Sequence, residues 1–382
     1  MNTGVEDSTR YCFIAEWFDP QAALVRQYQL FFYPRDCSIE IFDLKTRRSF
    51  LKKTKYDAIK GSEYFVGNVI NVYSRQMTLK EYGDEFTRKQ LSTSQETTLA
   101  IIKPDATRFK GDILQAMSRD GFKVTQIQMC HLTKDQAGAF YAEHKGKPFF
   151  NNLVELMTSG CCIVMELMRP NAILRWRDLL GPTNTQQAQA SAPNSIRARF
   201  GTDQTKNACH GSDSPESARR ELEFFFPRDT SRSRAPANTA RLSNSTLAVV
   251  KPQAVKDDQL AQIVKDIDAA GFNILALKSF NLEKSDCEEF LEVYKGVVNE
   301  YGDMVCEMSS GTCVALEIDA QGDPAKFRAF VGPADPEIAR HLRPQTLRAK
   351  YGKSKVQNAV HVTDLVDDAP LEVEYFFRIL SQ

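Results

Sequence analysis

The sequence predicts an α+β protein in which a small antiparallel β domain precedes two copies of one α+β module. Three observations lead to this prediction. Short aromatic and β-branched stretches dominate roughly the first 90 residues, the rest of the chain repeats itself, and a segment rich in Ser, Arg, Pro and Asn separates the two copies. A chain of 382 residues is also too long for one ordinary core, so two or three domains are expected.

The leader, residues 1–92, has the pattern of a β domain. Residues 10–18, 24–33, 38–43 and 66–73 are strand candidates, and turn signals such as Asp19-Pro20 separate them. Residues 79–91 carry Tyr82, Phe86 and Gln90 at helical spacing, which predicts a closing helix or a linker. The basic stretch 45–55 favours a solvated strand pair over a dedicated site for an acidic partner.

The internal repeat decides the rest of the architecture. Leu-Ala-Ile-Ile-Lys-Pro at 99–104 returns as Leu-Ala-Val-Val-Lys-Pro at 247–252, and Gly121-Phe122 returns as Gly271-Phe272. Five further pairs share one interval of 151 positions, namely Arg177 with Arg328, Arg197 with Arg348, Asn207 with Asn358, His210 with His361 and Glu221 with Glu372. We infer a duplication, with modules at 96–226 and 245–382 and a linker at 227–244.

Each copy has the same order of predicted elements. A buried strand comes first, then a helix ended by glycine (113–120 before Gly121, 260–270 before Gly271) and a second strand. A later apolar strand covers 161–167 or 312–318. This order predicts an α+β module whose sheet is covered by helices on one face.

The stretch around His210 carries the chemistry. Ser212, Asp213 and Ser214 are good N-cap types and Pro215 suits the first helical position, so a helix starts beside the imidazole. Helix N-termini attract anions, and a neutral histidine attacks phosphorus when its other ring nitrogen is hydrogen-bonded. Glu221, on the same predicted helix, is a candidate acceptor for that bond.

Other residues of the first copy complete a phosphate-transfer site. Lys103 is a point charge for phosphate, whereas Arg177 and Arg197 can bind its oxygens bidentately. Neutral hydrogen bonds can come from Tyr141, Thr183 and Asn207, and Phe149 can stack on a base. Each has an ordinary structural explanation, such as a core position for Phe149, but their joint presence favours the site.

These motifs resemble a known family. Lys103-Pro104-Asp105, Tyr141, Pro148-Phe149 and Asn207-x-x-His210-Gly-Ser-Asp-Ser are similar to the motifs of nucleoside diphosphate kinases, over residues 96–226. The resemblance implies a ferredoxin-like βαββαβ core and a ping-pong reaction through phosphohistidine. It also implies Mg²⁺ held by the nucleotide phosphates, with no metal ligand from protein side chains.

The same resemblance assigns roles by position. His210 becomes the phosphorylated nucleophile and Glu221 the residue that orients it. The nucleotide-binding residues become Lys103, Tyr141, Phe149, Leu153, Arg177, Thr183, Arg197, Asn207 and Gly211, the last leaving room beside the imidazole. Pro182 and Lys147 depart from the family pattern and affect the expected nucleotide affinity rather than the chemistry.

The second copy keeps only part of this set. Its equivalents are Lys251, Arg328, Arg348, Asn358, His361 and Glu372. Val362 replaces the glycine, Ala334 replaces the threonine, and the Pro-Phe pair is absent. Either Leu291 or Tyr294 takes the place of the lid tyrosine, depending on where a one-residue gap is set. We expect weak or no kinase activity and a mainly structural role.

The whole arrangement resembles one ciliary branch of the family, which carries tandem kinase modules behind a pleckstrin-homology-like (PH-like) leader. Phe13-Ile14-Ala15-Glu16-Trp17 and Gly67-Asn68 are among the matching leader residues. The resemblance implies a place in the cytoplasm and cytoskeleton, in the axoneme of cilia or flagella. The implied partners are ATP and NDP nucleotides, tubulin of doublet microtubules, other axonemal proteins and, in animal relatives, the γ-tubulin ring complex. An alternative is a purely structural microtubule inner protein with vestigial kinase folds.

Composition limits the other function classes. Lys plus Arg and Asp plus Glu both number 49, which removes the usual electrostatic basis for a nucleic-acid or anionic-membrane surface. The first seven residues lack the basic flank and apolar core of a signal peptide, so a soluble intracellular protein is expected. Nine cysteines without a Cys-x-x-Cys pair favour reduced thiols over a disulfide frame or zinc site.

Overall fold

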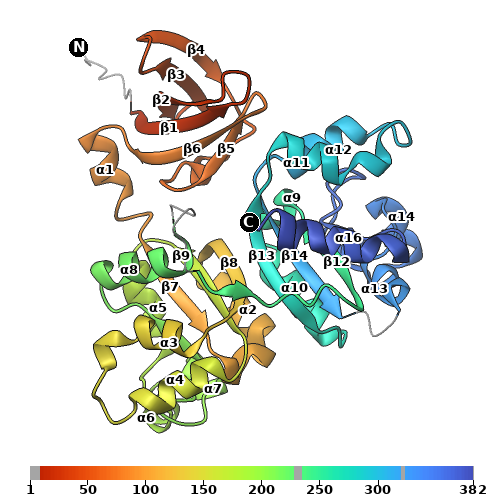
Figure 1. Ribbon diagram of the computed structural model, residues 1–382. Helices are drawn as coiled ribbons and strands as arrows, with labels where there is room; N and C mark the ends of the chain where they lie inside the picture. Colours follow the sequence, from red (N-terminus) through yellow and green to blue (C-terminus); the bar gives the residue numbers. More distant parts are fainter. Residues whose placement is uncertain (1–8, 228–234, 320–322, 382) are drawn as a thin grey trace, which may run out of the picture.

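The computed structural model describes residues 9–227, 235–319 and 323–381, and it has three parts (Figure 1). Part of the predicted linker, 228–234, and the predicted ends of the leader and the second module lie outside the described residues. The leader is an antiparallel sheet of order β4-β3-β2-β1-β6-β5, followed by a short helix. Its elements are β1 (Tyr11–Asp19), β2 (Leu24–Tyr33), β3 (Ser38–Asp43), β4 (Arg48–Lys55), β5 (Val69–Val72), β6 (Arg75–Tyr82) and α1 (Glu85–Leu91).

The prediction of a helix or linker over 79–91 is wrong at its start. Residues 79–82 belong to β6, where Leu79 pairs with Ala15 and is fully buried. Pairing with β1 therefore outweighs the helical spacing of the aromatic residues. The helix begins only after Asp84, whose side chain accepts from the backbone N–H of Thr87 at 2.7 Å. The basic stretch 45–55 supplies one strand, β4, which is an exposed edge of the sheet rather than a strand pair.

The two modules share one continuous sheet. Its strand order is β10-β7-β9-β8-β13-β14-β12-β15. Equivalent strands of the two modules lie at equal distances from the centre, where β8 and β13 are adjacent. The first module contributes β7 (Thr97–Ile102), β8 (Lys123–His131), β9 (Cys162–Met168) and β10 (Cys209–Gly211). The second contributes β12 (Ser245–Val250), β13 (Ile274–Asn281), β14 (Thr312–Asp319) and β15 (Val360–Val362). The modules thus pack as two equivalent subunits joined edge to edge.

Helices cover both faces of this sheet, so the prediction of helices on one face alone is wrong. Ala100 and Ile102 of β7 pack in one core with helices α2 and α5, whereas Leu99 and Ile101 pack in another with α3, α4 and α8. The first module has α2 (Lys110–Arg119), α3 (Lys134–Phe140), α4 (Phe150–Thr158), α5 (Ala172–Leu180), α6 (Thr185–Ser191), α7 (Ile196–Phe200) and α8 (Pro215–Phe225). The second has α9 (Pro252–Lys256), α10 (Leu260–Ala269), α11 (Lys284–Phe290), α12 (Tyr301–Met308), α13 (Pro324–Val331), α14 (Pro336–Leu342), α15 (Leu347–Tyr351) and α16 (Ala369–Glu374). A strand that is buried on both sides has no polar alternation to reveal its second layer.

No helix within the described ranges is long and apolar enough to span a lipid bilayer.

Helices α2 and α10 form the second contact between the modules. A Cβ atom on Gly111 would lie 2.8 Å from the Cα atom of Lys265, so only glycine allows this approach. Lys110 Nζ and Asp268 Oδ1 form a 2.6 Å ion pair next to it. One hydrophobic core continues from the first module into the second across these helices. The two modules are therefore a single packed body.

The described part of the predicted linker is held by the second module and by β8. Residues Ala237–Asn238 form a short strand, β11, that pairs with β8. Farther on, the buried carboxylate of Glu317 accepts the backbone N–H groups of Arg241 and Leu242, both at 2.8 Å. These bonds fix the direction in which the chain enters the second module.

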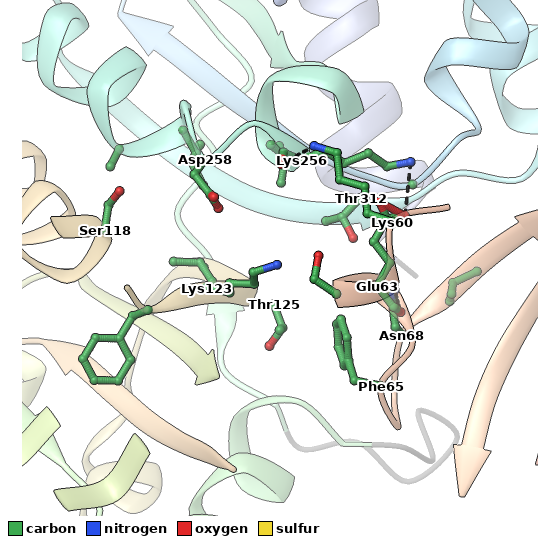
Figure 2. Close-up of a pocket in the computed structure, with 18 of the residues that line it drawn as sticks. Lys60, Glu63, Phe65, Asn68, Ser118, Lys123, Thr125, Lys256, Asp258 and Thr312 are labelled. Carbon is green, nitrogen blue, oxygen red and sulfur yellow. Dashed lines mark hydrogen bonds and ion pairs between the residues drawn. The ribbon is translucent and has the colours of Figure 1, made fainter. Parts of the chain in front are cut away.

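The leader docks on the second module, close to the first. Lys60 pairs with Asp257 at 3.2 Å and Lys256 pairs with Glu63 at 3.4 Å. A small cavity of about 120 Å³ lies at this junction and is also lined by first-module residues. Figure 2 shows Lys123 of the first module across it from Lys60 and Lys256. All three parts of the chain therefore line one junction.

Candidate functional site

His210 lies on β10, the outermost strand of the first module, where it pairs with Ile101 of β7. Its Nε2 atom is 2.9 Å from Oε2 of Glu221, and Ser212 donates its hydroxyl to the same oxygen at 2.7 Å. Glu221 comes from α8, which begins as predicted, with Ser214 as N-cap and Pro215 at its first position. The short strand and the capped helix thus bring the imidazole and the carboxylate together.

This hydrogen bond sets the tautomer of His210. Because the Glu221 carboxylate accepts at Nε2, that nitrogen carries the proton and Nδ1 keeps its lone pair. Within the described chain, no residue forms a hydrogen bond with Nδ1. The rings of Phe140 and Tyr141 pack edge-on against the imidazole, at centroid distances of 5.4 and 5.8 Å. The ring is therefore held with Nε2 toward Glu221 and with Nδ1 unpaired in the described part of the chain.

The structure corrects the role expected for Gly211. A Cβ atom on this residue would point at the indole of Trp176, 2.4 Å from Cδ1, rather than toward a ligand beside the imidazole. Trp176 also donates Nε1–H to the carbonyl of His210 at 3.1 Å. Glycine is required so that Trp176 can pack against β10 and hold the backbone of the histidine.

Lys103 lies at the end of β7 with its ammonium buried. Nζ donates to Oδ1 of Asn207 at 2.7 Å and to the carbonyl of Thr205 at 3.1 Å. Burial lowers the pKa of Lys103 to about 8, partly offset by the nearby carboxylate of Asp105. A buried amine with few partners has capacity for an incoming anion, since binding a phosphate would restore its charge.

Arg197 connects this lysine cluster to the histidine strand. Its guanidinium donates to the carbonyls of Gly181 at 2.8 Å and Cys209 at 3.2 Å, and it lies 3.5 Å from Oγ1 of Thr183. Burial, with the repulsion of Arg177, lowers the pKa of Arg197. Asn207 completes the link, because its Nδ2 donates to the carbonyl of Thr183 at 3.1 Å. The structure therefore places Lys103, Thr183, Arg197 and Asn207 in one network beside His210.

The lid residues lie on the other side of the imidazole. Phe149 is 39% exposed and packs against the ring of His144, which in turn stacks on Tyr141. The Tyr141 hydroxyl is buried without a hydrogen-bond partner in the described chain, and burial raises its pKa. Leu153 is buried in the core beneath, so it offers less surface to a ligand than Phe149 does.

Sequence reasoning did not identify the residues that shape the backbone before His210. Ala208 has φ of 68°, a left-handed conformation that is uncommon for a residue with a side chain. Its N–H donates to Oδ2 of Asp105 at 3.1 Å. The second copy repeats this feature at Ala359, with φ of 67°. The repeated Asn-Ala dipeptide was the available signal for it.

The family model described as "Nucleoside diphosphate kinase" matches residues 96–231 and 244–380, which is more than half of the chain. The chain belongs to the nucleoside diphosphate kinase family. Residues 5–93 also match the model described as "Nucleoside diphosphate kinase 7 N-terminal PH domain". The match confirms the PH-like leader and the two kinase-type α+β modules as the fold class.

Individual relatives of the kinase family agree. The chain is 51% identical to "Nucleoside diphosphate kinase homolog 7" of Rattus norvegicus and, equally, of Mus musculus, over 98% of this chain and 94% of each relative. Among solved structures, the Aquifex aeolicus nucleoside diphosphate kinase is 47% identical over 35% of this chain and 96% of that one, with a TM-score of 0.34. The identity to the two mammalian relatives, together with the match of the leader, confirms the resemblance to the branch that carries tandem kinase modules behind a PH-like leader.

The second kinase-type module keeps the histidine arrangement. His361 Nε2 lies 3.3 Å from Oε2 of Glu372, and Thr363 donates to the same oxygen at 2.7 Å. Leu291 rather than Tyr294 takes the place of the lid tyrosine, because it is the C-cap residue of α11 as Tyr141 is the C-cap residue of α3. Val362, in place of the glycine, packs in a core that includes Phe327, the counterpart of Trp176. The valine therefore fits a smaller ring and does not obstruct a ligand.

The other second-copy equivalents are also close together. Lys251, Arg328, Arg348, Asn358 and His361 line one cavity. Arg348 donates to the carbonyls of Val360 and Gly332, both at 2.9 Å, and burial lowers its pKa to about 10.

The donor chemistry of the first site fits a metal carried by the nucleotide. Within the described residues, no group of three or more His, Cys, Asp or Glu side chains could hold a metal ion. The side chains around His210 are instead cations and neutral donors, which suit phosphate oxygens. Mg²⁺ would therefore be bound through the phosphates of a nucleotide, with Lys103, Arg177 and Arg197 holding those phosphates.

Proposed function

We propose that the first module is a nucleoside diphosphate kinase that transfers the γ-phosphate of a nucleoside triphosphate to a nucleoside diphosphate through phosphohistidine at His210. The observation that carries this proposal is the pairing of Nε2 with Glu221, which leaves Nδ1 free beside a network of buried cations. A histidine held in a core for packing alone would not require that set of partners.

The reaction follows from this geometry. Nδ1 of His210 attacks the γ-phosphorus, an N–P bond forms, and the bond from phosphorus to the β–γ bridging oxygen breaks as the diphosphate leaves. Positive charge that develops on the ring is stabilised by Glu221, which accepts the Nε2 proton throughout. A second diphosphate then attacks the phosphohistidine by the reverse path. No separate general base is needed, since Nδ1 carries no proton at the start.

Lys103, Arg177 and Arg197 would stabilise the negative charge on the transferring phosphoryl oxygens. Mg²⁺ bound to the nucleotide would neutralise further charge on the β- and γ-phosphates. Asn207, which the network fixes in place, would contact the sugar, and Phe149, the exposed aromatic of the lid, would stack on the base.

Labelling with γ-phosphate-labelled ATP and magnesium tests this proposal. The wild-type chain is expected to take up an acid-labile, base-stable phosphate, and His210→Ala is expected to take up none. His361→Ala is the matched control in the second copy and should be labelled like the wild type. Equal labelling of wild type and His210→Ala would refute the assignment.

We also infer that the second module does not turn over nucleotides, because the lid aromatic and the threonine are replaced by Glu300 and Ala334. In a chain with His210→Ala, this predicts no phosphate transfer from ATP to GDP above the uncatalysed rate. Residual transfer that disappears on His361→Ala would contradict it.

A structural role in the axoneme of cilia or flagella is the second proposed function, and it rests on the resemblance to the ciliary branch. The observation that favours it is the rigid union of all three parts, with the leader bonded to the second module through Lys60, Glu63 and Asn71. Such a body suits a microtubule inner protein that contacts tubulin and other axonemal proteins.

Localisation in ciliated cells that lack the endogenous protein tests this second role. A tagged chain is expected in the axoneme, and His210→Ala should be incorporated equally well. Deletion of residues 1–92 should weaken incorporation. Failure of the full chain to enter the axoneme, or a requirement for His210, would contradict a structural role there.

A further inference from the structure

The second module contains a cavity of about 910 Å³ with an excess of positive charge. Its lining includes five basic side chains, Lys251, Arg328, Arg343, Arg348 and Lys355, and three carboxylates. Two of the carboxylates, Glu300 and Asp335, lie 3.9 and 4.0 Å from Lys355. The cations deeper in the cavity are left to bind an anion.

The duplication provides an internal comparison for this charge. At three positions the second copy is more basic than the first, with Arg343 for Ala192, Lys355 for Gln204 and Ala329 for Asp178. All three second-copy residues line the cavity. Two other lining positions are more acidic in the second copy, with Glu300 for Phe149 and Asp335 for Asn184, and both carboxylates lie beside Lys355. These opposite changes in charge largely cancel, so the cations that would bind an anion are the buried Lys251 and Arg348, the counterparts of Lys103 and Arg197.

The part of the cavity that would hold a base has lost its exposed aromatic side chain. Helix α4 begins after Phe149 and α12 begins after Glu300, so a carboxylate lies where the first module presents its exposed aromatic ring. Stacking on that position is lost. The ligand is therefore recognised by its anionic groups and not by a nucleobase.

The outer arginine of the cavity, Arg328, is paired with a carboxylate of the protein itself, that of Asp364. Asp364 Oδ1 lies 2.9 Å from Nη2 of Arg328, and its Oδ2 accepts the hydroxyl of Tyr294 at 2.5 Å. In the first copy the equivalent Asp213 instead bonds to Ser217 near the start of α8, which holds its pKa below the usual value. Leu365 replaces the capping Ser214 and Asp368 replaces Ser217, so Asp364 lacks the serine partner of Asp213 and pairs with Arg328 instead, although a 3₁₀ turn at Val366–Asp368 still precedes α16.

Asn358 and Lys251 show that the inner part of the cavity is incomplete without a ligand. The Oδ1 atom of Asn358 is buried and has no partner in the described chain, whereas its counterpart on Asn207 accepts from Lys103. Lys251 donates only to the carbonyl of Val356, at 2.9 Å. A bound anion would favour the charged form of Lys251. The ammonium would then have enough N–H donors for the anion, the Val356 carbonyl and Oδ1 of Asn358.

We propose that this cavity binds the polyphosphate group of a ligand without recognition of a nucleobase, and that Asp364 takes the place of a phosphate on Arg328 when the ligand is absent. The proposal goes beyond the kinase reaction of the first module and does not depend on it. Arg328, Arg348 and Lys251 would hold the phosphates. Tyr294, released by Asp364, would move with the lid.

Calorimetric titration of the full chain with tripolyphosphate and with ATP tests the proposal. The background carries Lys103→Met and Arg197→Gln so that the first site is silent. Asp364→Asn is expected to bind tripolyphosphate about tenfold more tightly than the background, since it removes the internal competitor. Arg328→Gln should abolish binding, and Asp367→Asn, an exposed carboxylate nearby, should change nothing.

Two further readouts separate binding in this cavity from a structural effect. Tripolyphosphate and ATP should bind within about threefold of each other. Binding near pH 7.5 should take up protons, seen as a heat that depends on the buffer, because burial lowers the pKa of Lys251 to about 7 and a phosphate would raise it. Lys251→Met should remove that dependence.

Unchanged affinity in Asp364→Asn, binding that survives Arg328→Gln, or ATP binding more than tenfold tighter than tripolyphosphate would each overturn the proposal. If the double-variant background does not fold, the native first site is kept and the stoichiometry is counted. Two tripolyphosphate sites are then expected in Asp364→Asn, and one site would overturn the proposal.

Discussion

Trp176 lies so close to Gly211 that a Cβ atom on residue 211 would be 2.4 Å from its indole ring. In the second copy the same two positions hold Phe327 and Val362, both buried. The same space is therefore filled by different side chains in the two modules. The first has an indole next to a glycine, and the second has a smaller phenyl ring next to a valine. The size of the side chain at residue 211 therefore limits the size of the ring at residue 176.

This relationship predicts the effect of Gly211→Val. The added side chain would overlap Trp176, so the free energy of unfolding should fall by about 1–3 kcal/mol. Displacement of Trp176 would also break its bond to the His210 carbonyl, so phosphate uptake should fall as well. Urea denaturation and phosphohistidine labelling measure the two effects.

The double variant Trp176→Phe with Gly211→Val is the control, because it recreates the pair of the second copy. It should recover most of the lost stability, whereas labelling should recover less because the indole N–H is gone. Independent, additive losses in the two single variants would show that the residues are not coupled in this way.

The Glu221 carboxylate gives a second prediction. In Glu221→Gln the side chain can still contact Nε2, but as an amide it no longer stabilises the charged ring, so the rate of phosphohistidine formation should fall about 10²- to 10⁴-fold. Rapid-quench labelling measures this rate. Glu216→Gln, exposed on the same helix, should be silent. A Glu221→Gln rate within threefold of wild type would mean that the carboxylate does not orient the imidazole.

The sequence predicted that His210 and Glu221 lie together, because both belong to a pattern that the chain repeats. The interval of 151 positions from His210 to His361 and from Glu221 to Glu372 located both histidine–carboxylate pairs, and the N-cap signal at Ser214 located the helix that joins them. Local chemistry and duplication were sufficient there.

Contacts between distant segments could not be predicted in that way. The packing of Trp176 on Gly211, the pairing of β8 with β13 and the bond from Asp364 to Arg328 join elements that no periodicity relates. The second helical layer was missed for a similar reason, because a strand buried on both faces shows no alternation. Residues 79–82 were predicted to belong to a helix or a linker because helical spacing does not reveal their pairing with β1.

The buried lysine of the first site predicts a pH dependence. Since the pKa of Lys103 is about 8 and phosphate binding needs the ammonium, kcat/KM should decline as the pH rises through 8, up to about tenfold per unit above it. The same shift affects stability with a defined sign. Between about pH 8 and 10.5 the unfolded chain holds this proton and the folded chain does not, so the contribution of this group to stability increases with pH.

Lys103→Arg separates this lysine from other titrating groups. Arginine remains charged across the range, so the decline in kcat/KM near pH 8 should disappear even if the overall rate is lower. A coupled assay from pH 6.5 to 9.5 measures both profiles. An identical decline in the arginine variant would assign the titration to another group.

The ion pair between Lys110 and Asp268 predicts how strongly the two modules depend on each other. Lys110 is buried, so Asp268→Asn would leave an ammonium without its partner between α2 and α10. Loss of one partner from a fully buried pair costs about 3–5 kcal/mol, but Asp268 keeps some contact with solvent, so we expect about 2 kcal/mol. Asp112→Asn removes the more exposed pair with Lys265 and should cost about 0.5 kcal/mol or less.

Because one core crosses this interface, urea should unfold both modules of the wild type in one transition, and Asp268→Asn should shift that transition for both. Separate transitions in the wild-type chain would contradict a shared core.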